Sequence, residues 1–254
     1  MAGFSDRTVS GFDMRALPHP AVTLAIEFGE GRLTVDDTTG QRAEGSLVAG
    51  LMPGPARLRG VAIAAVQVRL SPLSAQSVFG VSPTELDGAA IGLDDLWGRQ
   101  ASLIREQLAE APSWDARFRL VEDLLVDRQQ ARSTVDPEVA FCWEQIVAGR
   151  GQIRIGDLAA ACGWSRKRLW SRFRAQLGFT PKRGAMVVRF DSAAHRLVAG
   201  QDPADVAATS GYVDQSHLHR DVRAFAGCTP VGLTNHAWLA VDDVAWPAAA
   251  GAVL

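Results

Sequence analysis

Two similar segments near the C-terminal end constrain the fold of this 254-residue chain more than any other feature. The first is LAAACGWSRKRLWSRFRAQLGFTP at 158–181, and the second is VAATSGYVDQSHLHRDVRAFAGCTP at 206–230. Matching Leu, Gly, Thr and Pro positions keep one constant offset, except that the second segment has one extra residue after its first glycine, Gly211. Two copies are too few for a solenoid, so the repeat predicts a duplicated module.

Each copy predicts a helix, a turn and a second helix. Gly163 and Gly211 stand where a left-handed residue would stop the first helix. Ser165 and Asp214 are suited to cap the helix that follows, because their side-chain oxygens accept from its free N–H groups. Short helices joined by a glycine-containing turn are typical of the helix-turn-helix. We therefore expect two such units, with second helices at 165–177 and 214–226.

The outward faces of these two second helices predict their chemistry. Leu169, Phe173 and Leu177 recur every four residues and should face the core. The opposite faces hold cationic and hydrogen-bonding side chains, which suit the phosphates and base edges of a DNA major groove. With neighbouring residues they give the DNA-binding candidates Arg166, Lys167, Trp170, Ser171, Arg174, Gln215, Ser216, His219, Arg220 and Arg223.

One alternative remains for these faces as a whole, and another for the Trp170 side chain. Polar helix faces are often merely solvated, although finding the same geometry twice favours DNA. Trp170 has two equal interpretations, since its ring would either pack on a neighbouring helix or touch a thymine methyl group or sugar.

The charge distribution agrees with a DNA-binding C-terminal part. The whole chain has a formal net charge of −2. Residues 151–240 hold 12 Lys and Arg against 6 acidic residues, whereas residues 1–150 hold 14 Arg against 20 acidic residues. A basic block beside an acidic one indicates two domains, one of which meets a polyanion.

The remaining pattern predicts strands followed by helices. Apolar runs at 21–28, 32–35, 45–51 and 61–70 are strand candidates, and 32–35 should return as the hairpin partner of 21–28. Helical spacing appears from about Leu73, with helices expected at 94–108 and 113–126. The polar stretch 127–136 is the expected linker, and further helices should cover 137–148 and 181–199, the last one joining the two units.

These motifs resemble the AraC family of bacterial transcription regulators over residues 137–236. The spacing G-x-S-x(3)-L-x(3)-F-x(4)-G-x-[ST]-P occurs in the first unit, and G-[FY]-x-D-Q-S-x-[LF]-x-R occurs in the second. The resemblance implies a seven-helix DNA-binding domain. It places base-reading roles on Lys167, Trp170, Ser171, Ser216, His219 and Arg220. Ser171 departs from a frequent Arg, and Val222 from a frequent Phe that would pack the second unit more tightly.

The resemblance also implies a β-rich, cupin-like sensing domain followed by dimerising helices. We therefore expect an α+β fold, with a sensing or dimerising domain at 1–131, the all-α double helix-turn-helix domain at 137–240 and a tail at 241–254. Expected partners are double-stranded DNA in successive major grooves, RNA polymerase, a small-molecule effector and a second copy of the chain. No cofactor is expected.

An enzyme is the main rival class, as a fusion of this module to an enzymatic N-terminal domain. A metal-dependent cupin needs several converging ligands, but His19 is the one histidine in residues 1–150. Cys142, Cys162 and Cys228 form no C-x-x-C pair, so buried free thiols are expected. An interaction module that has lost DNA affinity is the second alternative. Without a membrane-length apolar run or a signal-peptide pattern, we expect a cytoplasmic protein.

Overall fold

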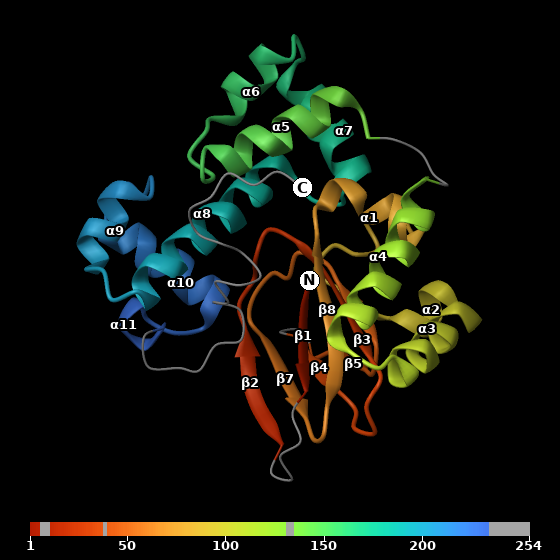
Figure 1. Ribbon diagram of the computed structural model, residues 1–254. Coiled ribbons are helices and arrows are strands. Elements are labelled where there is room, and N and C mark those ends of the chain that lie inside the picture. The colour runs from red at the N-terminus through yellow and green to blue at the C-terminus, as the bar shows by residue number, and fades with distance from the viewer. Residues whose placement is uncertain (6–10, 38–39, 131–134, 234–254) are drawn as a thin grey trace.

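The computed structural model describes residues 1–5, 11–37, 40–130 and 135–233, with strands in its first part and helices after them (Figure 1). The strands are β1 (Ala2–Ser5), β2 (Phe12–Ala16), β3 (Val22–Glu27), β4 (Thr34–Asp36), β5 (Arg42–Glu44), β6 (Leu47–Ala49), β7 (Ala56–Gly60), β8 (Ala64–Leu70) and β9 (Ala90–Gly92). The helices are α1 (Pro72–Phe79), α2 (Leu93–Trp97), α3 (Arg99–Glu110), α4 (Trp114–Gln130), α5 (Pro137–Ala148), α6 (Ile155–Ala161), α7 (Arg166–Leu177), α8 (Pro181–Val198), α9 (Pro203–Thr209), α10 (Gln215–Ala226) and α11 (Pro230–Leu233). The expected α+β class is confirmed, whereas the expected tail at 241–254 lies outside the described residues.

The strands form two antiparallel sheets. One sheet has the order β1-β8-β3-β6-β9, and the other has the order β2-β7-β4-β5. Burial along β3 alternates between two cores because successive side chains point to opposite faces of a sheet. Val22, Leu24 and Ile26 pack towards the helices, while Ala25 joins the core between the sheets. The first sheet thus has apolar residues on both faces, one against the helices and one against the second sheet.

The expected hairpin between 21–28 and 32–35 is wrong. β3 pairs with β6 and β8, whereas β4 belongs to the other sheet and pairs with β5 and β7. The chain crosses between sheets at Gly29–Gly31, where the N–H groups of both glycines donate to carbonyls of Ala64 and Ala62. A Cβ on Gly31 would lie 1.7 Å from the Val61 carbonyl oxygen, so only glycine fits this crossing.

Helices α1–α4 also differ in detail from the expectation. The single helix expected at 94–108 is two helices, because the chain turns at Gly98, which has φ of +53°. Ser113 caps α4, with its hydroxyl accepting from the Ala116 N–H at 3.2 Å. α4 continues to Gln130, so the first part of the expected linker 127–136 is helical. A polar sequence does not end a helix when its polar residues lie on the solvent face.

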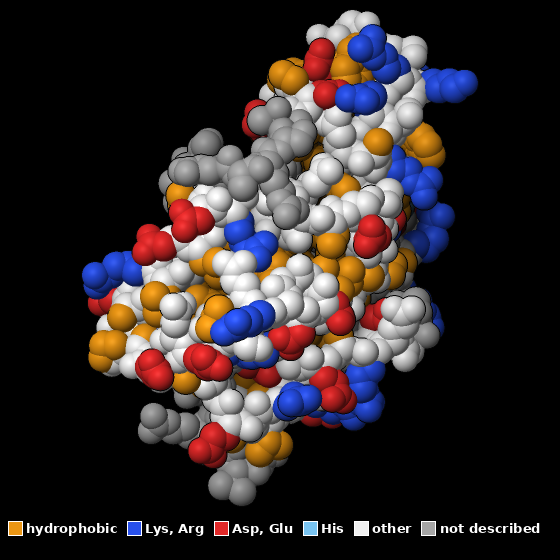
Figure 2. All heavy atoms as spheres, turned by 90° about the vertical axis from the view of Figure 1, so that its right-hand side faces the viewer, with side chains coloured by type: hydrophobic (Ala, Val, Ile, Leu, Met, Phe, Trp, Pro, Cys, Tyr) orange, Lys and Arg blue, Asp and Glu red, His pale blue; other side chains and the backbone are white. Residues whose placement is uncertain are grey.

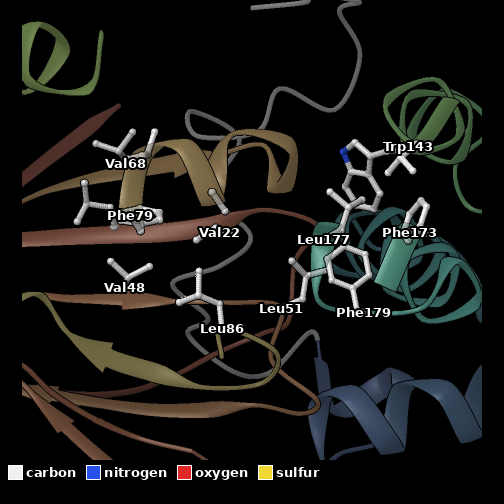
Figure 3. Packing of buried hydrophobic residues seen from close by; sticks show 14 of the residues in the cluster. Val22, Val48, Leu51, Val68, Phe79, Leu86, Trp143, Phe173, Leu177 and Phe179 are labelled. Atoms are coloured by element: carbon white, nitrogen blue, oxygen red, sulfur yellow. The ribbon is translucent and has the colours of Figure 1, made fainter. Parts of the chain in front are cut away.

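A continuous hydrophobic core joins the first sheet to the first helix-turn-helix unit. Figure 3 shows Val22, Val48 and Phe79 of the N-terminal part in line with Leu51, Leu86 and then Leu177, Phe179 and Trp143. Phe173 and Phe179 meet edge to face with ring centroids 5.8 Å apart, and Trp143 meets Phe179 at 5.6 Å. The second unit has its own core around Val187, Phe190, Leu218 and Phe225.

Candidate nucleic-acid interface

Capping residues set the start of both outward-facing helices, α7 and α10. The Ser165 hydroxyl accepts from the Arg168 N–H at 3.2 Å, and the Asp214 carboxylate accepts from the His217 N–H at 2.7 Å. Gly163 and Gly211 precede these caps with φ of +65° and +75°. Both turns therefore follow the predicted pattern, in which a left-handed glycine and a capping oxygen redirect the chain into the second helix.

Apolar side chains hold α7 and α10 against the domain by their inner faces. Leu169 and Phe173 of α7 are fully buried, as are Leu218 and Val222 of α10. Phe225 of α10 lies against Phe190 of α8 with ring centroids 4.9 Å apart. Val222, the residue that stands where the AraC pattern often has Phe, is therefore fully buried in the same core as the Phe190–Phe225 pair.

The opposite faces are open to solvent. All ten residues predicted to bind DNA are exposed, namely Arg166, Lys167, Trp170, Ser171, Arg174, Gln215, Ser216, His219, Arg220 and Arg223. The Trp170 side chain is 47% exposed, and the guanidinium of Arg174 lies 5.4 Å from the centre of its ring. Arg220 folds back along its own helix, where its Nε donates to the Ser216 carbonyl at 3.3 Å.

Several other cations of this domain are already engaged in the fold. Arg172 makes two 2.8 Å hydrogen bonds to Asp136, which hold the pKa of that carboxyl below its usual value. Arg189 pairs with Asp221 at 2.9 Å. Arg166 is exposed but extends over α6, since a Cβ on Gly156 would lie 2.7 Å from its guanidinium. Arg168 stacks over Trp164 at 4.5 Å, and sequence spacing alone gave no sign of that contact.

Helix α8 holds the two units apart, with α6 and α7 at one end and α9 and α10 at the other (Figure 1). Its 18 residues make it about 27 Å long at 1.5 Å per residue. Thr180 caps the helix, with its hydroxyl accepting from the Arg183 N–H at 3.2 Å, and Pro181 occupies the first turn. α8 therefore sets the distance and angle between α7 and α10.

The basic character of this end is visible on the surface. Figure 2 shows the molecule from the side of α1–α4, with Lys and Arg side chains gathered at its upper end, where α5–α7 lie. Basic and acidic side chains are mixed over the lower part of the same face. On this face the basic side chains therefore gather over the first helix-turn-helix unit.

A second candidate site lies between the two sheets, and sequence reasoning missed it. It is a cavity of about 90 Å³, and most of its walls are apolar, with Phe12, Ala25, Leu47, Met52 and Leu58 among them. Polar side chains join it on strands of the first sheet, namely Thr23, Gln67 and Arg69. No local motif announces such a cavity, because its residues come from six strands and from the loops between them.

His19 lies at the wall of this cavity, in the segment between β2 and β3. Its Nε2 lies 3.0 Å from the Thr23 hydroxyl. Burial, with smaller contributions from the nearby Arg69 and His195, lowers the pKa of His19 to about 3, so the ring is neutral at physiological pH. Within the described residues, no group of three or more His, Cys, Asp or Glu side chains is placed to hold a metal ion.

The three cysteines are free thiols in the structure. Cys142 is buried on α5, and its Sγ lies 3.4 Å from that of Cys162 at the end of α6. Burial raises the pKa of the Cys142 thiol to about 12, which leaves it protonated and unreactive at neutral pH. Among the described helices, none has the length and apolar character needed to cross a membrane.

Comparisons with known proteins agree with this geometry. A helix-turn-helix domain family matches residues 158–235. The uncharacterized HTH-type transcriptional regulator YbfI of Bacillus subtilis (strain 168) is 35% identical over 66 residues, which are 26% of this chain and 24% of that protein. The matched region thus spans about a quarter of the length of this curated relative.

Solved structures extend the likeness to the whole described fold. ToxT from Vibrio cholerae is 10% identical, with a TM-score of 0.50, over 92% of this chain and 97% of ToxT. ToxT from Vibrio cholerae O395 bound to (E)-4-(8-methylnaphthalen-1-yl)but-3-enoic acid is also 10% identical, over 92% of this chain and 97% of that chain, with a TM-score of 0.51. At this identity the likeness shows a common fold. The structure thus combines a helix-turn-helix domain at 158–235 with a two-part fold like that of ToxT.

Proposed function

We propose that this protein is a sequence-specific DNA-binding transcription regulator whose helices α7 and α10 enter successive major grooves. The observation that carries the proposal is the repeated geometry of the two outer faces. Each presents exposed cationic and hydrogen-bonding side chains opposite a fully buried apolar face. A helix in a major groove needs this division, because donors must reach guanine O6 and N7 while the other face stays anchored.

Arg220 is the residue to which we assign direct base reading in the second unit. It is exposed near the middle of α10, where its Nε makes a weak 3.3 Å hydrogen bond to the backbone of its own helix. Exchange of that bond for two bonds to guanine leaves no buried group unpaired. Arg174 and Arg223 lie in the last turns of their helices, where we assign them to phosphates.

The test compares Arg220→Ala with Arg220→Lys on a randomised DNA site. We expect Arg220→Ala to cost about 1–3 kcal/mol in binding and to relax the preference at one base pair. Arg220→Lys keeps the charge but loses the planar fork, so it should lose base preference while the salt dependence of binding stays unchanged. Arg119→Ala on the exposed surface of α4 is the matched control and should change neither. An even loss of affinity at every sequence would show that Arg220 contacts phosphate alone.

We further propose that the cavity between the sheets is the site of a small-molecule effector. Its apolar walls and few polar side chains are typical of ligand sites. The ToxT structure with a bound naphthalenyl butenoic acid supports an effector of this kind. That compound is the first probe: it should raise the Tm of the wild type, and Ala25→Leu, which fills the cavity, should abolish the shift. An equal shift in both proteins would place the binding elsewhere.

Two further partners stay predictions. We expect dimerisation through residues 1–130, so light scattering should give a larger assembly for the full chain than for a fragment of residues 132–254. If light scattering shows that both the full chain and the fragment are monomers, dimerisation through residues 1–130 is contradicted. We also expect contact with RNA polymerase, as the resemblance to bacterial transcription regulators implies.

A further inference from the structure

The wall of the cavity between the two sheets includes a residue that also belongs to the core of the second helix-turn-helix unit. Leu17 follows β2, lines the cavity and is 5% exposed. It packs in the same cluster as Phe190 of α8 and Leu218 and Phe225 of α10, with Ala16 at its edge. A side chain with a hollow on one side and a close-packed core on the other transmits displacement, because packed interiors yield little.

His19 gives the same segment a second link to α8. Its Nδ1 is shut off from solvent and has no hydrogen-bond partner among the described residues. Charged and titratable groups face it from two elements, Arg69 on β8 and His195 on α8. His195 in turn bonds through Nδ1 to the Asp191 carbonyl at 2.8 Å, one turn back along α8. The segment between β2 and β3 therefore lies between the cavity and α8, and Leu17 gives it an apolar contact with the core around α8.

The first unit is attached to the N-terminal part at places outside the cavity. A Cβ on Gly178, at the end of α7, would lie 2.1 Å from the Pro83 carbonyl oxygen. Arg183 pairs with Asp87 and donates to the Leu51 carbonyl. Leu51 stands between two cavity residues, Gly50 and Met52, and is the alternative route from the cavity. These contacts hold the first unit firmly against a change in the cavity.

We propose that filling the cavity between the sheets displaces the second helix-turn-helix unit relative to the first, through Leu17 in the segment between β2 and β3. A ligand would thereby change the spacing of the two DNA-reading helices while the first unit stays fixed to the sheets. The consequence for DNA rests on the proposed function. The displacement itself does not, so it is measured first without DNA.

The experiment fills the cavity by substitution and follows amide hydrogen exchange. Ala25→Leu adds apolar volume from β3, and Ala49→Leu adds it from β6 should the first variant fail to fold. We expect exchange in α9 and α10 to change by about fivefold, near the low end of couplings between sites, with α6 and α7 unchanged. Equal or larger changes in α6 and α7 would establish the Leu51 route and overturn the proposal, as would no change in a folded, filled variant.

A matched pair of truncations then tests the route. Leu17→Ala and Leu58→Ala both remove a leucine from the cavity wall, but only Leu17 is in the core of the second unit. The effect of filling on α9 and α10 should vanish in the Leu17→Ala background and persist in the Leu58→Ala background. Persistence in both would overturn the role of Leu17. Should the wild type show no DNA preference, the proposed function fails while the exchange result still decides this inference.

Discussion

The two helix-turn-helix units have the same local design but different attachments to the rest of the molecule. The first shares one hydrophobic core with the first sheet and α1–α4, through Leu177 and Phe179. The second has a separate core, and among the described residues of the N-terminal part only Leu17 is a fully buried member of it. A duplicated sequence can therefore give one unit that shares a core with the N-terminal part and one whose core is largely its own.

The largest expected effect comes from emptying each core in turn. Phe173→Ala and Phe225→Ala should each cost about 3–5 kcal/mol in the free energy of unfolding. They should differ in what unfolds. Phe173→Ala should lower the stability of the first sheet and of the first unit together, because they share a core. Phe225→Ala should loosen α9–α11 alone.

Hydrogen exchange in increasing denaturant separates these outcomes. In Phe225→Ala, amides of α10 should lose protection at denaturant concentrations where β3 and β8 are still protected. Loss of α10 and β3 protection at the same concentration would break the comparison, because it would make the two cores one cooperative unit.

His19 gives a smaller effect that depends on pH. Its pKa is lowered to about 3 in the fold from 6.5, so the unfolded chain binds more protons between these values. Its contribution is thus complete above pH 6.5 and is lost as the pH falls. Between pH 7 and pH 5, the free energy of unfolding of the wild type should fall by about 2 kcal/mol more than that of His19→Gln.

The carboxyl of Asp191 acts in the opposite direction and is common to both proteins. Burial raises its pKa to about 6, so the fold loses stability as the pH rises from about 4 to 6. Its contribution cancels in the difference between wild type and His19→Gln. Parallel stability curves for the two proteins between pH 7 and pH 5 would contradict a buried, neutral His19.

The smallest effect concerns the ion pair that attaches the first unit. Arg183 and Asp87 are 28% and 24% exposed, so their coupling should be about 0.5–1 kcal/mol. A double-mutant cycle with Arg183→Met and Asp87→Asn measures it, and 1 M salt should reduce it. A coupling near zero would leave the attachment of the first unit to its apolar contacts.

Local signals predicted the helical half well. Caps such as Ser165 and Asp214, left-handed glycines and Pro181 act within a few residues, so the sequence determines them where they stand. The strands at β2 and β7 were missed because their outward residues are charged. Arg57 pairs with Asp13 across these strands, and Arg59 pairs with Asp36 on β4. Such pairs depend on strand order, which no single run of residues reveals.

The candidate site divides in the same way. The outer faces of α7 and α10 follow from helical spacing, and their exposure agrees with the residues chosen. The cavity and the double role of Leu17 depend on how sheets and helices pack at long range, so the sequence alone did not predict them. We also predict that residues 132–254 fold independently, and the shared core makes Leu177 and Phe179 the side chains that such a fragment would uncover.

The most direct test of the whole account is selection of DNA from a fully randomised pool by the intact protein. Two recognition helices held by α8 predict two short blocks of preferred bases whose centres lie about 10 base pairs apart, one helical turn. Lys167→Ala should weaken one block and Arg220→Ala the other. Recovery of sequences with no preferred positions, or loss of the same block in both variants, would contradict reading by two units.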